Sequence, residues 1–134
     1  LGFYTPASGH LDYASAGHPY PVIIKASGEF EMLNLAGMPL GVRAKPVIGS
    51  ASRSIEPGES LVIYTDGLVE TTSAGGQMLG FESFAKICAK TCALEPAAAV
   101  DSIIASANAW GPQNDDQTVV VLKRSQSGDG HANN

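Results

Sequence analysis

Two acidic segments that lie far apart in the sequence each adjoin an apolar run with the composition of a β-strand. Leu61 to Thr65 is rich in β-branched and aromatic residues, as buried strands are, and it ends at Asp66. Asp115 and Asp116 stand before a second such run, Val119 to Leu122. If the two strands are antiparallel neighbours, the end of the first lies beside the start of the second. Carboxylates gathered at one sheet edge repel one another, which favours a bound hard divalent cation.

Each acidic segment also has an ordinary structural interpretation. Asp66-Gly67 between apolar runs is a strong signal for a two-residue β-hairpin, here joining 61–65 to 68–72. From this stretch alone, the hairpin and the metal site are equally favoured. Asp115-Asp116 also suits a turn before a strand, because acidic residues are common turn formers. His18, in a Gly-His-Pro sequence, is interpreted as a turn histidine rather than a metal ligand.

The composition is that of a single globular domain and excludes several classes of function. With 134 residues, 44% of them hydrophobic, the chain is long enough for a hydrophobic core. Its net charge of -5 argues against a nucleic acid partner, which needs a basic face. No run has the length of a membrane span and no signal-peptide pattern opens the chain, so we expect a cytoplasmic protein without membrane contact. The chain begins at Leu1 inside a strand pattern without an initiator Met, which indicates a fragment.

Turn residues and alternating polarity predict a series of short antiparallel strands. The first two should form a hairpin, and the first four an antiparallel meander. Glycines and a proline predict a loop at 36–42. The expected strands are 2–5, 11–16, 22–25, 29–33, 47–55, 61–65 and 119–122.

Two helices are predicted before the last strand. Apolar residues recur at helical spacing from Phe81 to Cys92, and Pro96 suits the first turn of a second helix that continues to Trp110. Cys88 and Cys92 are expected to be small core residues on the first helix. The polar segment 71–76 is expected to be a mobile loop. The sum is an α+β domain at 1–124, followed by a disordered polar tail at 125–134.

Several other binding and catalytic patterns do not fit the sequence. Neither acidic segment has the alternating spacing of an EF-hand calcium loop, and there is no P-loop or Gly-x-Ser-x-Gly sequence. A haloacid-dehalogenase phosphatase needs a nucleophilic Asp two positions before the Asp of its Asp-Gly, where this chain has Tyr64.

Four segments, taken together in their order and spacing, resemble the metal-dependent protein phosphatase family (protein phosphatase 2C-like), specifically its bacterial SpoIIE/RsbU branch. Each segment alone is unspecific, but the four in register cover nearly all of the chain before its tail. They are Leu11 to Pro19 (LDYASAGHP), Gly37 to Gly41 (GMPLG), Ile55 to Glu70 (IEPGESLVIYTDGLVE) and Asp115 to Thr118 (DDQT).

The resemblance implies an α+β antiparallel β-sandwich flanked by helices, the four-layer αββα phosphatase type, with a two-metal site for Mn²⁺ or Mg²⁺ at one edge. Carried over to this chain, Asp66 and Asp115 coordinate metal, Gly67 allows a sharp chain path beside the ions, and Asp116 is an outer residue or an alternative ligand. No catalytic side chain is expected, because the nucleophile is a water that the metals activate near neutral pH. Oxygen ligands suit such hard ions. Segment 71–76 is expected near the substrate.

The sequence also departs from the family pattern. The family's metal-bridging Asp comes from an earlier Asp-x-x-Gly-His-Gly-type segment, which would precede Leu1. The chain is therefore expected to be the C-terminal portion of a phosphatase domain, without its N-terminal strands and helices and with an incomplete metal site. An uncovered sheet face should then seek a partner, such as a second copy of the chain in a homodimer.

The resemblance implies a metal-dependent protein serine/threonine phosphatase in bacterial signalling. Its expected substrate is a phosphoprotein, an anti-sigma-factor antagonist, under control of an upstream sensor or receiver domain. The alternative is a non-catalytic binding or regulatory module with a phosphatase-like fold, as a truncated domain or a pseudophosphatase. A third hypothesis is a plain antiparallel sheet domain that Mn²⁺ does not stabilise.

Overall fold

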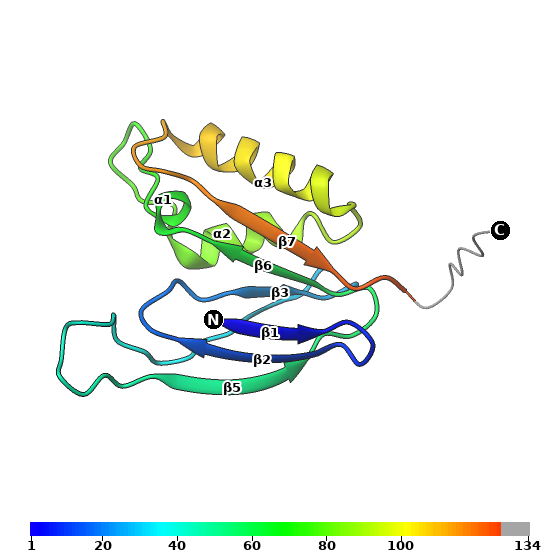
Figure 1. Cartoon of the computed structure of the whole chain (residues 1–134). Helices are drawn as coiled ribbons and strands as arrows, with labels where there is room; N and C mark the ends of the chain where they lie inside the picture. The colour runs from blue at the N-terminus through cyan, green and yellow to red at the C-terminus, as the bar shows by residue number, and fades with distance from the viewer. Residues whose placement is uncertain (127–134) are drawn as a thin grey trace.

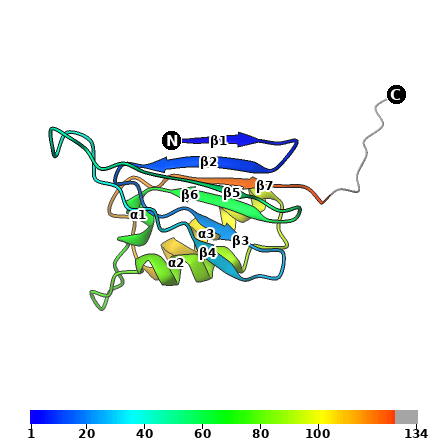
Figure 2. The same ribbon diagram turned by 90° about the horizontal axis from the view of Figure 1, so that it is seen from below.

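The computed structural model describes residues 1–126, which form two stacked antiparallel sheets with helices on one side (Figure 1). Figure 2 shows the same layers from below, and in both views α2 and α3 lie on the side of one sheet that faces away from β1 and β2. The elements are β1 (Gly2–Thr5), β2 (His10–Ser15), β3 (Val22–Ile24), β4 (Phe30–Met32), β5 (Gly49–Ser54), β6 (Ser60–Tyr64), α1 (Asp66–Val69), α2 (Gly80–Ala89), α3 (Pro96–Trp110) and β7 (Val119–Lys123).

The first sheet has the strand order β1-β2-β5, and the second has the order β4-β3-β6-β7. The predicted hairpin of β1 and β2 is confirmed, with Gly2 opposite Tyr13. The predicted meander of four strands is wrong, because the chain crosses from one sheet to the other between β2 and β3. Hairpin patterning is local and does not determine which sheet a hairpin joins.

The antiparallel pairing of β6 and β7 is confirmed by a register that runs from Ser60 opposite Lys123 to Tyr64 opposite Val119. Four of the five residues of β6 are buried, because this strand lies in the interior of its sheet between β3 and β7. Such a strand reads as a nearly continuous apolar run, as Leu61 to Tyr64 does. The end of β6 therefore lies beside the start of β7.

Two hydrophobic clusters hold the layers together. The larger one lies between the second sheet and the helices, and includes Tyr64, Phe84 and Ile103. The smaller one lies between the two sheets, and includes Ile23, Ile55 and Leu61. Because side chains alternate across a strand, Leu61 and Val62 contribute to opposite clusters.

Both predicted helices are present as α2 and α3. Cys88 is a fully buried core residue, as expected, whereas Cys92 lies beyond the end of α2 and is only partly buried. The segment 71–76 is not uniformly exposed: Thr71 is buried, and Thr72 forms an isolated β-bridge with Met78.

The hairpin interpretation of Asp66-Gly67 is wrong. The residues after Tyr64 form the short helix α1 instead of a returning strand, and Leu68 and Val69 enter the larger core cluster. Burial of these two apolar side chains against the helices favours the helical turn over a hairpin, which would direct only alternate residues inward.

The expected α+β sandwich is thus present, with one helical layer in residues 1–126. Within this range no helix covers the outer face of the β1-β2-β5 sheet (Figure 1). Among these residues no helix is long and apolar enough to cross a membrane. The tail expected to be disordered is residues 125–134, and from residue 127 onward it lies outside the described range.

Candidate metal centre

Strand ends of both sheets meet at one end of the sandwich. The pairing registers place the last residues of β2, β4 and β6 and the first residues of β3, β5 and β7 at this end. The helix α1 and the connections 16–21, 33–48 and 111–118 lie there too (Figures 1 and 2). We call it the acidic end, because Asp66 and the Asp115-Asp116 pair belong to it.

Asp66 is the first residue of α1 and follows directly on β6. Its side chain is exposed, whereas Gly67, Leu68 and Val69 are buried. The N–H of Glu70 donates to the Asp66 carbonyl at 2.9 Å and closes the single turn. The chain therefore turns inward immediately after Asp66 and leaves its carboxylate at the surface.

Gly67 brings the two acidic segments into backbone contact. A Cβ at this position would collide with the carbonyl oxygen of Asp116 and lie 3.4 Å from the carbonyl carbon of Asp115. Only glycine permits so close an approach of two backbones. The expected meeting of the two segments at one sheet edge is therefore found in the fold.

Thr65 locks the same junction with its side chain. Its hydroxyl donates to the Asp116 carbonyl at 3.2 Å and accepts a hydrogen bond from the Thr118 N–H at 2.9 Å. Its backbone N–H also donates to the Thr118 carbonyl at 3.0 Å. Sequence reasoning assigned no role to Thr65, although a Thr before an Asp-initiated turn is a recognisable helix-start signal.

The side chains of Gln117 and Thr71 form hydrogen bonds to the Gly67 carbonyl. The Thr71 hydroxyl donates to the Gly67 carbonyl at 3.0 Å, and the Gln117 amide Nε2 lies 3.4 Å from the same oxygen and 3.3 Å from the Thr71 hydroxyl. Thr71 is 1% exposed, so its hydroxyl is shielded from water. The sequence alone gave no signal for this network, because it joins residues 46 positions apart.

The Asp66 and Asp115 carboxylates are each oriented by the amide of the next residue. The Gly67 N–H donates to Asp66 Oδ1 at 3.1 Å, and the Asp116 N–H donates to Asp115 Oδ1 at 2.7 Å. Within residues 1–126, no Lys, Arg or His forms an ion pair with Asp66, Asp115 or Asp116. All three acidic side chains are exposed.

The carboxylates of Asp66, Asp115 and Asp116 are the type of ligand that a hard divalent cation prefers, but too few of them lie together to hold one. Carboxylate oxygens without a neighbouring cation are the ligands that Mg²⁺ and Mn²⁺ prefer. In the described part of the chain, however, no three Asp, Glu, His or Cys side chains lie close enough to hold an ion together. Residues 1–126 therefore supply too few such side chains for a complete coordination sphere. His18 lies exposed at the same end and borders an apolar pocket there.

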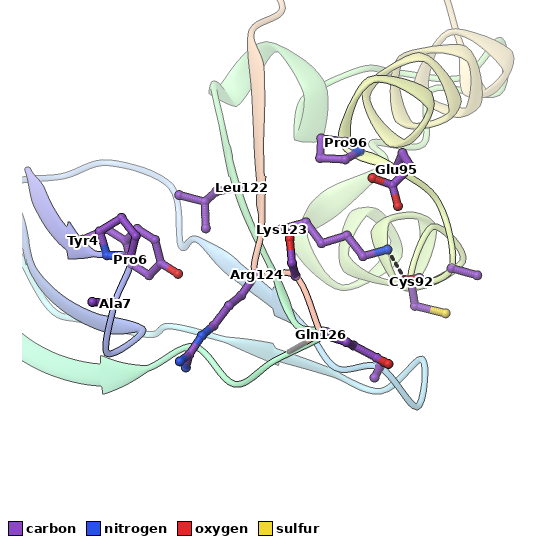
Figure 3. A pocket seen from close by; sticks show the side chains of 14 residues that line it. Tyr4, Pro6, Ala7, Cys92, Glu95, Pro96, Leu122, Lys123, Arg124 and Gln126 are labelled. Carbon is purple, nitrogen blue, oxygen red and sulfur yellow. Dashed lines mark hydrogen bonds between the residues drawn. The ribbon is translucent and has the colours of Figure 1, made fainter. Parts of the chain in front are cut away.

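A cleft lies at the opposite end of the sandwich, near the end of β7 (Figure 3). It has a volume of about 1070 Å³. Its two cations are engaged by backbone: Lys123 Nζ donates to the carbonyls of Cys92 and Leu94 at 3.2 and 2.7 Å, and Arg124 Nη1 donates to the Ile55 carbonyl at 2.7 Å. This cleft holds none of the predicted site residues.

Residues 1–125 match the family described as Stage II sporulation protein E (SpoIIE). The chain belongs to the SpoIIE family. The resemblance to the SpoIIE/RsbU branch of the metal-dependent protein phosphatase family, inferred from four short segments, is thereby confirmed.

Several solved structures share the fold. The structure of the RsbU and RsbW domains of Rv1364c from Mycobacterium tuberculosis has a TM-score of 0.73 and 25% identity, over 96% of this chain and 36% of that one. The phosphatase domain of SpoIIE from Bacillus subtilis has a TM-score of 0.71 and 17% identity, over 96% and 56%. The SiaA-PP2C domain of Pseudomonas aeruginosa has a TM-score of 0.74 and 18% identity, over 86% and 46%.

A curated relative, Protein IcfG of Synechocystis sp., is 31% identical over 80 residues, which are 60% of this chain and 13% of that protein. The chain thus spans only a part of each of the proteins that it matches. Among the solved structures that share its fold, the Bacillus subtilis domain is described as a phosphatase domain.

Proposed function

We propose that the protein containing this chain is a metal-dependent serine/threonine phosphatase, and that Asp66 and Asp115 are two of its metal ligands. The observation that carries the proposal is the junction of β6 and β7, where Gly67 contacts the Asp116 carbonyl and two oriented carboxylates stand at one edge. Membership of the SpoIIE family supports the same reaction class.

The ions of the proposal are two Mn²⁺ or Mg²⁺ ions. When bound, they would neutralise the phosphate dianion and supply a water that is nucleophilic near neutral pH. In the reaction, the water oxygen bonds to phosphorus, the P–O bond to the serine or threonine side chain breaks, and a proton passes to the departing hydroxyl oxygen.

The chain's own part is to hold donors in place. Asp66 and Asp115 each keep one carboxylate oxygen, Oδ2, outside the hydrogen bond from the next amide and thus free for an ion. Asp116 is an outer residue or an alternative ligand. Thr65 and Gln117 are positioning residues, because they fix the backbone that carries these carboxylates.

The proposed substrate is a phosphoprotein, such as an anti-sigma-factor antagonist, with control by a sensor or receiver domain elsewhere in the protein. The RsbU and RsbW domains named for the Mycobacterium tuberculosis relative support a regulatory setting of this kind. The homodimer, in which a second copy of the chain covers the uncovered sheet face, is likewise part of the proposal.

One observation favours the rival, a non-catalytic binding or regulatory module. Residues 1–126 contain no group of three metal-binding side chains. Such a module would keep the fold and the acidic edge without turning over a substrate.

Phosphate release from a phosphothreonine peptide by the full-length protein tests the proposal. We expect release with millimolar Mn²⁺, none with a chelator, and a fall of roughly a hundredfold or more in the Asp66→Asn and Asp115→Asn variants. The Asp101→Asn variant is the matched control, because Asp101 is an exposed carboxylate on α3. A folded protein that releases no phosphate with Mn²⁺ or Mg²⁺ would contradict the phosphatase and favour the binding module.

A further inference from the structure

The connection between β4 and β5, residues 33–48, projects from the acidic end (Figures 1 and 2). Its base is fixed: Gly37 and Ile48 form a β-bridge, and the Met38 N–H donates to the Val47 carbonyl at 3.1 Å. Gly37 also lies against the Ser15 carbonyl, so closely that a Cβ would collide with it. The segment 39–46 beyond this base is exposed throughout. We call residues 39–48 the basic loop.

The charge of the basic loop is opposite to that of the molecule. The chain carries a net charge of -5, yet residues 32–55 contain no Asp or Glu and three of the eight Lys and Arg residues. Of these three, Arg53 pairs with Glu31 and Glu59. Within residues 1–126, Arg43 and Lys45 form no ion pair. Two neighbouring cations on one projecting loop are therefore free for an external anionic group.

The other cations of the chain are already engaged, with one exception. Lys25 and Lys86 pair with glutamates, and Lys123 and Arg124 donate to backbone carbonyls. Lys90, which directly follows α2, is exposed and forms no ion pair within residues 1–126. The free positive charge of residues 1–126 is thus concentrated on the basic loop.

The basic loop also exposes large apolar side chains. The exposed fractions are 66% for Leu40, 61% for Val42, 58% for Val47 and 50% for Ile48. A group of apolar side chains beside free cations is typical of a protein-binding surface, whereas a small phosphate ester would need only the charges.

We propose that the basic loop docks an acidic segment of the phosphoprotein substrate beside the Asp66–Asp115 edge. This inference rests on the proposed function. Arg43 and Lys45 attract acidic residues that flank the phosphorylated one, while Leu40 and Val42 contact apolar residues of the same partner. The loop offsets the repulsion that Asp66, Asp115 and Asp116 exert on an acidic partner at this end.

Peptide binding to the full-length protein tests the docking independently of catalysis. Two labelled phosphothreonine peptides of equal length, one with Asp and Glu flanks and one with Lys flanks, are titrated by fluorescence anisotropy in the presence of a chelator. We expect tighter binding of the acidic peptide. The Arg43→Glu/Lys45→Glu variant should bind it about tenfold more weakly, whereas the control Lys90→Glu should change its affinity less than about twofold.

Three results would overturn the docking proposal. The first is equal binding of the acidic and basic peptides by the unmodified protein. The second is an equal effect of the loop variant and of the Lys90→Glu control. The third is protection of the loop amides from hydrogen exchange before any peptide is added, which would mean that another part of the same polypeptide covers the loop. Selective binding without phosphate release in Mn²⁺ would support docking while contradicting the phosphatase proposal.

Discussion

The carbonyl oxygen of Asp116 lies against the α-carbon of Gly67, where any larger residue would place its Cβ. Around this contact, Thr65 binds the backbone of Asp116 and Thr118, and Gln117 reaches the Gly67 carbonyl. The junction of β6 and β7 is therefore fixed by both backbone and side-chain contacts. The same contacts hold the backbone of the two acidic segments in place.

Replacement of Gly67 by Ala should destabilise the domain. The added methyl group would force apart the start of α1 and the Asp115-Asp116 segment, at a cost of about 1–3 kcal/mol in the free energy of unfolding. Urea unfolding measures this difference. The matched control is Gly75→Ala, where the new Cβ would meet only the Ser73 hydroxyl, at 3.8 Å. Equal stability of both variants would show that the junction relaxes freely.

Arg53 of β5 ties the two sheets together. Its Nη2 lies 2.9 Å from Glu31 of β4, and its Nη1 lies 2.7 Å from Glu59, just before β6. The side chains of Arg53 and Glu59 are 18% and 9% exposed. Burial alone would raise the pKa of Glu59, but the hydrogen bonds from Arg53 and from the Glu56 N–H outweigh it and hold the pKa below the ordinary 4.5. Glu59 therefore stabilises the fold as a carboxylate.

The Glu59→Gln variant should lose about 1–3 kcal/mol of stability at pH 7. The pKa of Glu59 is lower in the folded protein than its unfolded value of 4.5. The Glu59 carboxylate therefore contributes its full stabilisation of the fold above pH 4.5, and this stabilisation is lost as the pH falls through the folded pKa. The difference in the free energy of unfolding between wild type and the Glu59→Gln variant, measured with urea, should thus be smaller at pH 3 than at pH 7. The Glu29→Gln variant, in an exposed pair with Lys25, should unfold at nearly the wild-type midpoint. A Glu59→Gln deficit that is independent of pH would contradict this account.

Tyr64 places a hydroxyl in the core without a hydrogen-bond partner among the described residues. Burial raises the pKa of Tyr64, so the group stays neutral. Tyr64→Phe keeps the ring contact with Phe84, at a centroid distance of 4.2 Å, and removes the unsatisfied group. We expect a gain of about 1 kcal/mol, seen as a higher melting temperature, whereas Tyr64→Ala should lose about 3–5 kcal/mol. A less stable Phe variant would reveal a partner for the hydroxyl.

The sequence predicted the β6–β7 edge because both strands carry a continuous apolar pattern, with Asp66 after the first and Asp115-Asp116 before the second. It did not predict α1, since Asp66-Gly67 is locally compatible with a hairpin as well as with a helical turn, and only the burial of Leu68 and Val69 in the core decides between them. Nor could local patterns place β2 and β3 in different sheets or pair Arg53 with Glu31, because both depend on tertiary packing. The metal-site roles of Asp66, Gly67, Asp115 and Asp116 stay predictions.

Mn²⁺ binding to the full-length protein, measured by isothermal titration calorimetry, tests whether Asp66 and Asp115 hold a metal ion. We expect Asp66→Asn and Asp115→Asn each to weaken Mn²⁺ binding at least about tenfold, while Asp101→Asn leaves the affinity unchanged. Wild-type affinity in both the Asp66 and Asp115 variants, with the fold intact, would show that the edge formed by β6 and β7 is not a metal site.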